Sequence, residues 1–213
     1  MAKKPAKKKS QHRPRPETAQ IKAIERLIDG GQFGKAIERV QALAQRFPDH
    51  GGLRRLLIEA LEQAKRRNAA ALAAFEWAEQ RPNSLAAQET LFRFAVAGYY
   101  ALLADRTARR IQALGGDTPG FPLDPAEMAP LLRQPDGSHG GVEDMERFDI
   151  GKLHLDAQDF RGAVRWLDGL ELLSARNNRA LALCSISSAS TMGWMHSCRP
   201  GKRTTTTCSH SLG

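Results

Sequence analysis

The sequence is poor in cysteine, in aromatic residues and in the β-branched residues that favour strands. All three cysteines lie after residue 183, so no disulfide framework can hold the rest of the chain together. Aromatic residues make up 6% of the 213 residues, and valine and isoleucine are few beside alanine and leucine. Helices are therefore the expected element. No window approaches the ~20 apolar residues of a membrane-spanning helix, so we expect no membrane segment.

Acidic residues are missing from both ends of the chain. Residues 1–16 contain seven bases, and residues 184–213 contain three. Residues 17–183 contain the other 22 bases and all 23 acids. The formal charge is therefore +9 for the whole chain but −1 for residues 17–183. The bases of the first segment, which are candidate nucleic-acid contacts, are Lys3, Lys4, Lys7, Lys8, Lys9, Arg13 and Arg15. We expect residues 1–17 to form a disordered, solvated tail that can hold phosphates only loosely. No apolar stretch follows the lysines, which argues against a secretory signal and favours the cytoplasm.

Two prolines mark a repeated pattern in the middle of the chain. Pro48 and Pro82 lie 34 residues apart, and each ends a run rich in Ala, Leu and Arg. Within each run, apolar residues recur at spacings of three and four on both sides of a break, which predicts two amphipathic helices joined by a tight turn. The break in the first run falls at residues 29–31, and a third, looser run ends at residues 115–116.

Residues 117–141 interrupt this pattern. They are rich in proline and glycine, which predicts a connector with one short helix, capped by Asp124 and with a proline in its first turn. Helical spacing then resumes, with a turn at residues 156–160 and a second helix that we expect to extend to Leu173. A further helix is expected to begin at Asn178.

These runs resemble the tetratricopeptide repeat family. Small, aromatic and proline residues stand where the family uses them for helix crossing, packing and helix ending. They are Gly31, Phe33, Ala36 and Pro48, then Leu57, Ala70 and Pro82, and later Ile150, Gly151, Asp159, Phe160 and Ala163. The resemblance covers most of residues 18–183 and implies a solenoid of stacked helix pairs. The sequence departs from the family pattern at Gln20 and Ile24, where a bulky aromatic residue and a glycine are expected, and the third run has no closing proline.

The family resemblance also implies a binding surface. The first helices of successive pairs line a concave groove that takes a peptide or helix of a partner protein. The groove positions here are Ile21, Glu25, Ile28 and Asp29; Arg55, Glu59, Glu62 and Gln63; and Glu89, Arg93 and Val96. The family's clamp for C-terminal carboxylates uses lysines and asparagines, and Ile21 and Glu25 in their places argue against it. The acids of the groove instead favour a ligand with some basic residues.

The chain changes character after Leu183. Residues 184–213 hold four successive threonines and no helical spacing of apolar residues, so we expect an irregular tail. If the codons are read one base earlier, residues 192–196 encode Gly, then Leu, Met or Val, then Asp and Ala, as in a helical repeat. We therefore hypothesise that residues 184–213 are a frameshift product, which resequencing the gene would test. A solenoid cut at this point exposes an apolar end face, and we expect self-association through it.

Residues that could carry chemistry are few and poorly placed for it. The candidates for zinc, which lack the usual two-residue spacing between cysteines, are Cys184, Cys198, Cys208, His196 and His210. His154, Asp156 and Asp159 stand at a helix end and a turn, where capping explains them, and His139 lies in a glycine-rich loop. The sequence has no HExxH, no GxSxG and no phosphate-binding glycine loop. We expect no metal, no cofactor and no catalytic activity.

The sequence thus predicts an all-α, helix-turn-helix repeat protein of the cytoplasm that binds another protein or a peptide and does not engage a membrane. Its predicted segments are 1–17, 18–116, 117–141, 142–183 and 184–213. Two alternative functions stay open. The chain could be a nucleic-acid- or ribosome-associated protein that works through its basic tail, or the regulatory repeat region of a longer enzyme cut short here.

Overall fold

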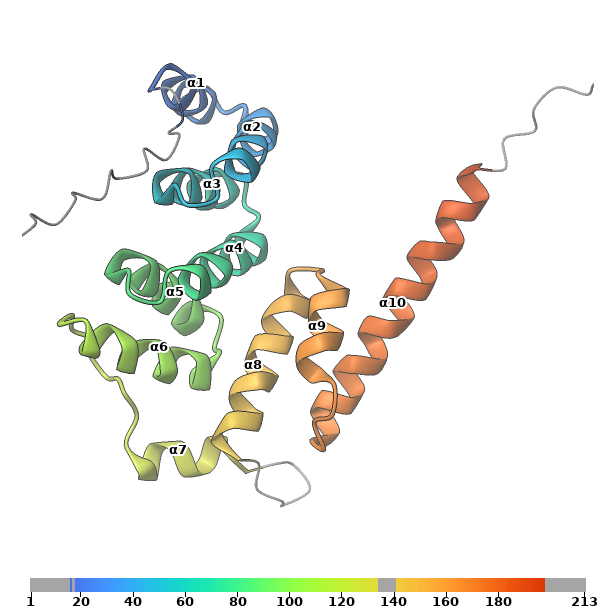
Figure 1. Ribbon diagram of the computed structural model, residues 1–213. Coiled ribbons are helices and arrows are strands. Elements are labelled where there is room, and N and C mark those ends of the chain that lie inside the picture. Colours follow the sequence, from blue (N-terminus) through green and yellow to red (C-terminus); the bar gives the residue numbers. More distant parts are fainter. Residues whose placement is uncertain (1–15, 17, 134–140, 198–213) are drawn as a thin grey trace, which may run out of the picture.

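The computed structural model describes residue 16, residues 18–133 and residues 141–197, with side chains up to residue 186. This part of the chain contains ten helices and no strand, which confirms the predicted all-α class for it (Figure 1). The first six helices are α1 (Thr18–Asp29), α2 (Phe33–Arg46), α3 (Gly51–Gln63), α4 (Arg67–Gln80), α5 (Leu85–Ala97) and α6 (Ala101–Ala113). The others are α7 (Pro125–Leu131), α8 (Val142–Asp156), α9 (Phe160–Leu167) and α10 (Leu173–Ser197).

The first six helices form three pairs whose turns have the same geometry. The central residue of each turn has a positive φ angle: 70° at Gly31, 60° at Lys65 and 59° at Tyr99. These three residues lie 34 positions apart. In each turn, the N–H of the central residue donates to the carbonyl three residues earlier, and the next N–H donates to the carbonyl five residues earlier. This is the Schellman ending of a helix, which satisfies carbonyls that the helix leaves unpaired.

The same period governs how the paired helices pack. Ala36, Ala70 and Ala104 lie five residues after the three turn centres, and all three are fully buried. Small side chains at these positions allow the backbones of the two helices to approach closely. The three pairs share one core of alanine, leucine, isoleucine and aromatic side chains, which begins at Ile24 and also includes Ile150 and Leu153.

The connector after α6 covers the end of the third pair. The Phe121 ring meets the Phe92 ring of α5 edge to face, with centroids 5.3 Å apart. The buried carboxylate of Asp105 on α6 accepts a hydrogen bond from the Leu123 N–H at 2.7 Å. The short helix α7 follows, with Asp124 as its N-cap, as predicted, and Glu127 completing a capping box.

A fourth pair, α8 and α9, repeats the turn geometry but not the position of the earlier pairs. The turn is centred on Gln158, with a φ angle of 64°, and Ala163 lies five residues later and is fully buried. Gln158 follows Tyr99 by 59 residues, which is 34 plus the 25 residues from 117 to 141. Helix α3 packs on α1 and α2, but α8 packs on α6 and α4, the second helices of two pairs. Figure 1 shows α8 and α9 beside the column that α1 to α6 form.

The helices after the fourth turn differ from the predicted ones. Helix α9 ends at Leu167 and not at Leu173, and α10 begins at Leu173 and not at Asn178. Gly169 breaks the helix with a φ angle of 72°, and the apolar side chains of Leu170 and Leu172 are buried in the bend that follows. The helical spacing therefore predicts the burial of Leu170 correctly, but Leu173, which continues the spacing, is exposed.

Helix α10 also extends into the segment for which an irregular tail is predicted. Its backbone is helical to Ser197, so residues 184–197 correct that prediction, while residues 198–213 lie outside the described residues. The first proline after Leu183 is Pro200, and alanine, serine and methionine allow a helix to continue once its first half is packed. Exposed leucines on α10, at the predicted end face, are Leu173, Leu181 and Leu183.

Within the described part of the chain, no helix is both long enough and apolar enough to cross a lipid bilayer.

Candidate functional site

The predicted groove residues lie on α1, α3 and α5, the first helices of the three pairs. Eight of the eleven have exposed side chains: Glu25, Asp29, Arg55, Glu59, Gln63, Glu89, Arg93 and Val96. Ile21 and Glu62 are half-buried. Ile28 corrects the prediction, because its side chain is only 8% exposed and belongs to the core between the helices. The residue therefore stabilises the first pair and cannot line an open groove.

An ion pair joins α3 and α5, the second and third helices of this face. Both guanidinium nitrogens of Arg93 on α5 donate to the two carboxylate oxygens of Glu62 on α3, at 2.8 and 3.0 Å. The Arg93 guanidinium also lies over the Phe94 ring, 4.7 Å from its centroid. A bidentate pair of this kind fixes the geometry of both side chains. Because Glu62 is already paired, it is not available to attract a basic ligand. The preference for such a ligand, which the acids of the groove suggest, therefore loses one of its acids.

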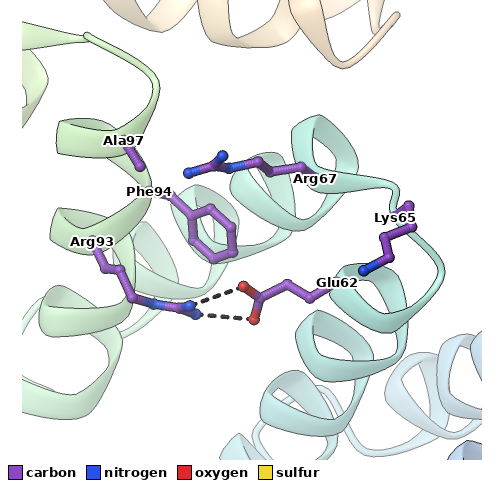
Figure 2. A pocket seen from close by; sticks show the side chains of 6 residues that line it. All are labelled: Glu62, Lys65, Arg67, Arg93, Phe94 and Ala97. Carbon is purple, nitrogen blue, oxygen red and sulfur yellow. Dashed lines mark hydrogen bonds and ion pairs between the residues drawn. The ribbon is translucent and has the colours of Figure 1, made fainter.

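A hollow of about 400 Å³ opens beside this ion pair (Figure 2). Its lining residues come from α3, from the turn after it, and from α4 and α5: Glu62, Lys65, Arg67, Arg93, Phe94 and Ala97. Figure 2 shows the Arg67 guanidinium reaching over the Phe94 ring from the side opposite Arg93. The hollow therefore combines an apolar wall with three cations and one carboxylate.

A second hollow, of about 290 Å³, lies on the other side of the same turn. It is lined by residues 65–69 of the α3–α4 turn and by residues 156–158 of the α8–α9 turn. The Asn68 side chain donates to the Asp156 carbonyl at 2.9 Å and holds the two turns together. Lys65 and Arg67 line both hollows, so the turn forms a ridge between them.

Three consecutive cations on this ridge have no partner within the part of the chain that the structure describes. Lys65, Arg66 and Arg67 are exposed, and none makes a side-chain hydrogen bond or ion pair with the described residues. Many other cations of the helices are neutralised nearby. Arg106 contacts Glu146 and Glu79, and Arg109 contacts Asp105. We call Lys65, Arg66 and Arg67 the cationic ridge. Sequence analysis missed it, although the 34-residue spacing from Gly31 identifies Lys65 as a turn residue.

The junction of α8 with α6 is a second polar site, and it is buried. The carboxylate of Asp149 accepts the N–H groups of Leu102 and Leu103, at 2.8 and 3.2 Å, and so caps α6 from another helix. Burial raises the pKa of Asp149 to about 6, although the two N–H groups and the charge of Lys152 act against this rise. An uncharged Asp149 is thus accessible in mildly acidic solution.

Asp156 joins the same junction. It accepts the hydroxyl of Tyr100 and the ammonium of Lys152, both at 2.7 Å. Burial, together with the hydrogen bond to Asp156, raises the pKa of Tyr100 far above its ordinary value. The tyrosine therefore stays neutral and donates, and the site has the character of a structural clamp.

Asp159 has the capping role that the sequence indicates, whereas His154, expected to be a capping or solvated residue, is buried. Asp159 caps α9 by accepting the Gly162 N–H at 3.0 Å, and its other oxygen lies 2.8 Å from His154 Nδ1. Burial acts to raise the pKa of Asp159, but these two hydrogen bonds lower it below its ordinary value. The His154 ring is buried against Phe75 and Trp166, and its Nε2 has no hydrogen-bond partner among the described residues.

The other candidates for chemistry are not brought together. No group of three or more His, Cys, Asp or Glu side chains in the described part of the chain is placed to hold a metal ion. Cys184 is exposed on α10. The remaining candidate residues lie outside the residues or side chains that the structure describes: His139, His196, Cys198, Cys208 and His210, and the tail bases Lys3, Lys4, Lys7, Lys8, Lys9, Arg13 and Arg15.

Comparison with known proteins gives no relative for this chain, since no family model, no curated protein and no solved structure matches it.

Proposed function

We propose that this chain is a tetratricopeptide-like repeat protein that binds a peptide or helix of a partner protein and has no catalytic activity. The observation that carries the proposal is the recurrence of one turn geometry at Gly31, Lys65 and Tyr99, at intervals of 34 residues. Identical turns at a fixed interval give successive helix pairs the same internal geometry. Stacking of equal pairs produces a curved array with one face made of first helices.

The polar face of α1, α3 and α5 is the proposed binding surface. Its exposed side chains are charged or amide-bearing, apart from Val96, and lie on helices that a shared core holds rigid. A preorganised surface of this kind loses little conformational entropy when a peptide binds. The exposed ion pairs that it offers contribute modestly, on the order of 1 kcal/mol each or less.

The test uses a library of random short peptides displayed on phage and panned on the full chain. We expect enrichment of a defined set of peptides. Their affinity should fall about tenfold when the charges of Arg55 and Glu59 are exchanged in the variant R55E/E59R, because two side chains of the groove then present the wrong sign.

The control exchanges two exposed charges on a second helix. The variant E38R/R39E on α2 has the same net charge as the wild type, and its side chains lie outside the proposed groove. It should bind the selected peptides as the wild type does. Failure to enrich any peptide, or equal losses in the two variants, contradicts the proposed function.

A second candidate function comes from the charge of the tail. Seven bases without an acid in residues 1–16 favour contacts with RNA phosphates, independent of the helical face. Deletion of residues 1–16 should then abolish binding of a single-stranded RNA probe and its salt dependence, and should leave peptide binding unchanged. RNA binding that survives the deletion contradicts this role of the tail.

A further inference from the structure

We propose that the cationic ridge of Lys65, Arg66 and Arg67 binds a short acidic segment of the partner polypeptide, with an apolar side chain of that segment in the hollow beside Phe94. This inference rests on the proposed function and specifies the chemistry of the partner. The proposed acidic partner differs from the basic ligand that the sequence predicts. That prediction counts the acids of the groove and does not consider which of them are paired with cations of the protein.

The first argument is the charge that remains after internal pairing. Both oxygens of Glu62 are occupied by Arg93, so the single carboxylate of the hollow is already neutralised. Lys65 and Arg67, which line the same hollow, have no counter-ion among the described residues. A ligand that supplies one or two carboxylates would complete the pairing.

The second argument is that the cations are mounted on a rigid turn. The Lys65 N–H donates to the Glu62 carbonyl and the Arg66 N–H to the Leu61 carbonyl, both at 2.9 Å. Lys65 has a φ angle of 60°, a conformation that favours glycine, and glycine stands at the equivalent position of the first pair. Tyr99 and Gln158 have similar φ angles at the equivalent turns, so the strain is not special to Lys65, but the turn fixes the point from which its side chain projects.

The third argument concerns the class of anion. The Phe94 ring and the Ala97 side chain give the hollow an apolar wall, which suits a peptide side chain and not a phosphate. Glu59 and Glu89 are exposed one helical turn before Glu62 and Arg93, and their charges repel a continuous phosphate backbone. A short acidic peptide segment places its charges on the ridge and avoids both glutamates.

The acidic segment that binds the cationic ridge cannot be either end of this chain. Residues 1–15 and 198–213 contain no aspartate or glutamate, so neither terminal segment can supply the carboxylates. Their bases would be repelled by the ridge. A partner with clustered Asp or Glu residues next to Leu, Ile, Val or Phe has the complementary charge and shape.

The experiment analyses the composition of the peptides that the library yields with the full chain. We expect enrichment of Asp and Glu next to an apolar residue. A synthetic copy of an enriched peptide, labelled with fluorescein, should lose about tenfold in affinity for the variant K65E/R67E and for K65G/R67A, and also when its acids are replaced by Gln and Asn. The variant K65G/R67A keeps the turn, because glycine accepts the positive φ angle.

The control variant R39E/R161E makes the same change in net charge at two exposed arginines of α2 and α9. It should bind the acidic peptide as the wild type does. Equal losses in R39E/R161E and K65E/R67E would show unspecific attraction and overturn the inference. Enriched peptides without acids, whose affinity depends on Arg55 and Glu59 but not on Lys65 and Arg67, would overturn it and leave the proposed function standing. If no peptide is enriched, both fail.

Discussion

The contacts among α1 to α6 and the contacts that join α8 to α6 differ in how many buried polar groups they contain. Helices α1 to α6 share an apolar core and follow one 34-residue period, so each pair supports the next through similar contacts. Helix α8 contributes Ile150 and Leu153 to the same apolar core, and carboxylates also join it to α6, with Asp149 on two backbone N–H groups, Asp156 on Tyr100 and Glu146 on Arg106. Apolar contacts are indifferent to pH, whereas the polar contacts of the junction include Asp149, whose pKa burial raises to about 6. We therefore expect the stability of the packing among α1 to α6 to depend less on pH than the stability of the junction between α8 and α6.

The largest expected effect tests the apolar core of the repeat region. Leu103 on α6 is 0% exposed, and the substitution Leu103→Ala leaves a cavity, so we expect a loss of about 3 kcal/mol in the free energy of unfolding. Leu173 on α10 is 52% exposed, and Leu173→Ala should cost about 0.5 kcal/mol or less. Urea titrations followed by circular dichroism measure both. Similar losses in the two variants would contradict the assignment of the core.

The next effect tests whether Asp149 makes the junction sensitive to pH. Its pKa of about 6 lies above that of an unfolded aspartate, so the folded state binds the proton more tightly. The contribution of Asp149 to stability is therefore greatest in acid and declines as the pH rises through about 4 to 6. Relative to the Asp149→Asn variant, the wild type should lose on the order of 2 kcal/mol between about pH 4 and pH 7.

This comparison uses the variant to cancel the titration of the remaining acids. Hydrogen exchange of the Leu102 and Leu103 amides reports the junction itself, since these N–H groups bond to Asp149. A difference between wild type and variant that is flat with pH, or that grows in favour of the wild type as the pH rises, would contradict the raised pKa.

A smaller effect tests the close crossing of α8 and α9. A Cβ atom added to Gly151 would lie 2.5 Å from Leu167 Cδ2, closer than real contacts allow. We expect Gly151→Ala to cost about 1 to 2 kcal/mol, because the two helices must separate. The control Gly34→Ala on α2 meets no atom within 4 Å and should be neutral or stabilising. Thermal melts of the two variants decide between these outcomes.

The smallest effect concerns the strained lysine of the cationic ridge. Lys65→Gly should stabilise the fold by about 0.5 to 1 kcal/mol, because glycine adopts the positive φ angle without strain. Gly31→Ala, at the equivalent turn of the first pair, should destabilise by a similar amount. Opposite signs for the two substitutions would confirm that the turns are equivalent, and equal signs would refute it.

Much of the fold is contained in local sequence signals. The three- and four-residue spacings, the 34-residue interval of Pro48 and Pro82, and the Asp124 cap predict the helices up to α8 correctly. The ends of α9 and α10 are missed, because Leu170 and Leu173 continue the helical spacing of Leu167 although the chain bends at Gly169. Spacing of apolar residues does not by itself show where a helix ends, and here it predicts burial correctly at Leu170 but not at Leu173.

The site is less accessible from sequence, because it depends on which charges meet. Glu62 and Arg93 are 31 residues apart, and only the packed helices bring them together and leave Lys65 and Arg67 unpaired. The contact of Asp149 with α6 is equally invisible, since the 25-residue connector moves α8 away from the place that the period assigns to it. The prediction that Ile28 lines the groove is wrong for a related reason. The position of a residue in a repeat does not specify which side chains surround it.

The segment that carries Phe121 and Leu123 makes one end of the array of helices different from the other. By lying against Phe92 and Asp105, it closes the terminus of the third pair with irregular chain, so another molecule cannot dock there as though it were the next pair. Fibre-like growth by head-to-tail addition is thereby blocked at this terminus. Association of copies then has to use another surface, and the exposed Leu173, Leu181 and Leu183 of α10 offer apolar side chains for it.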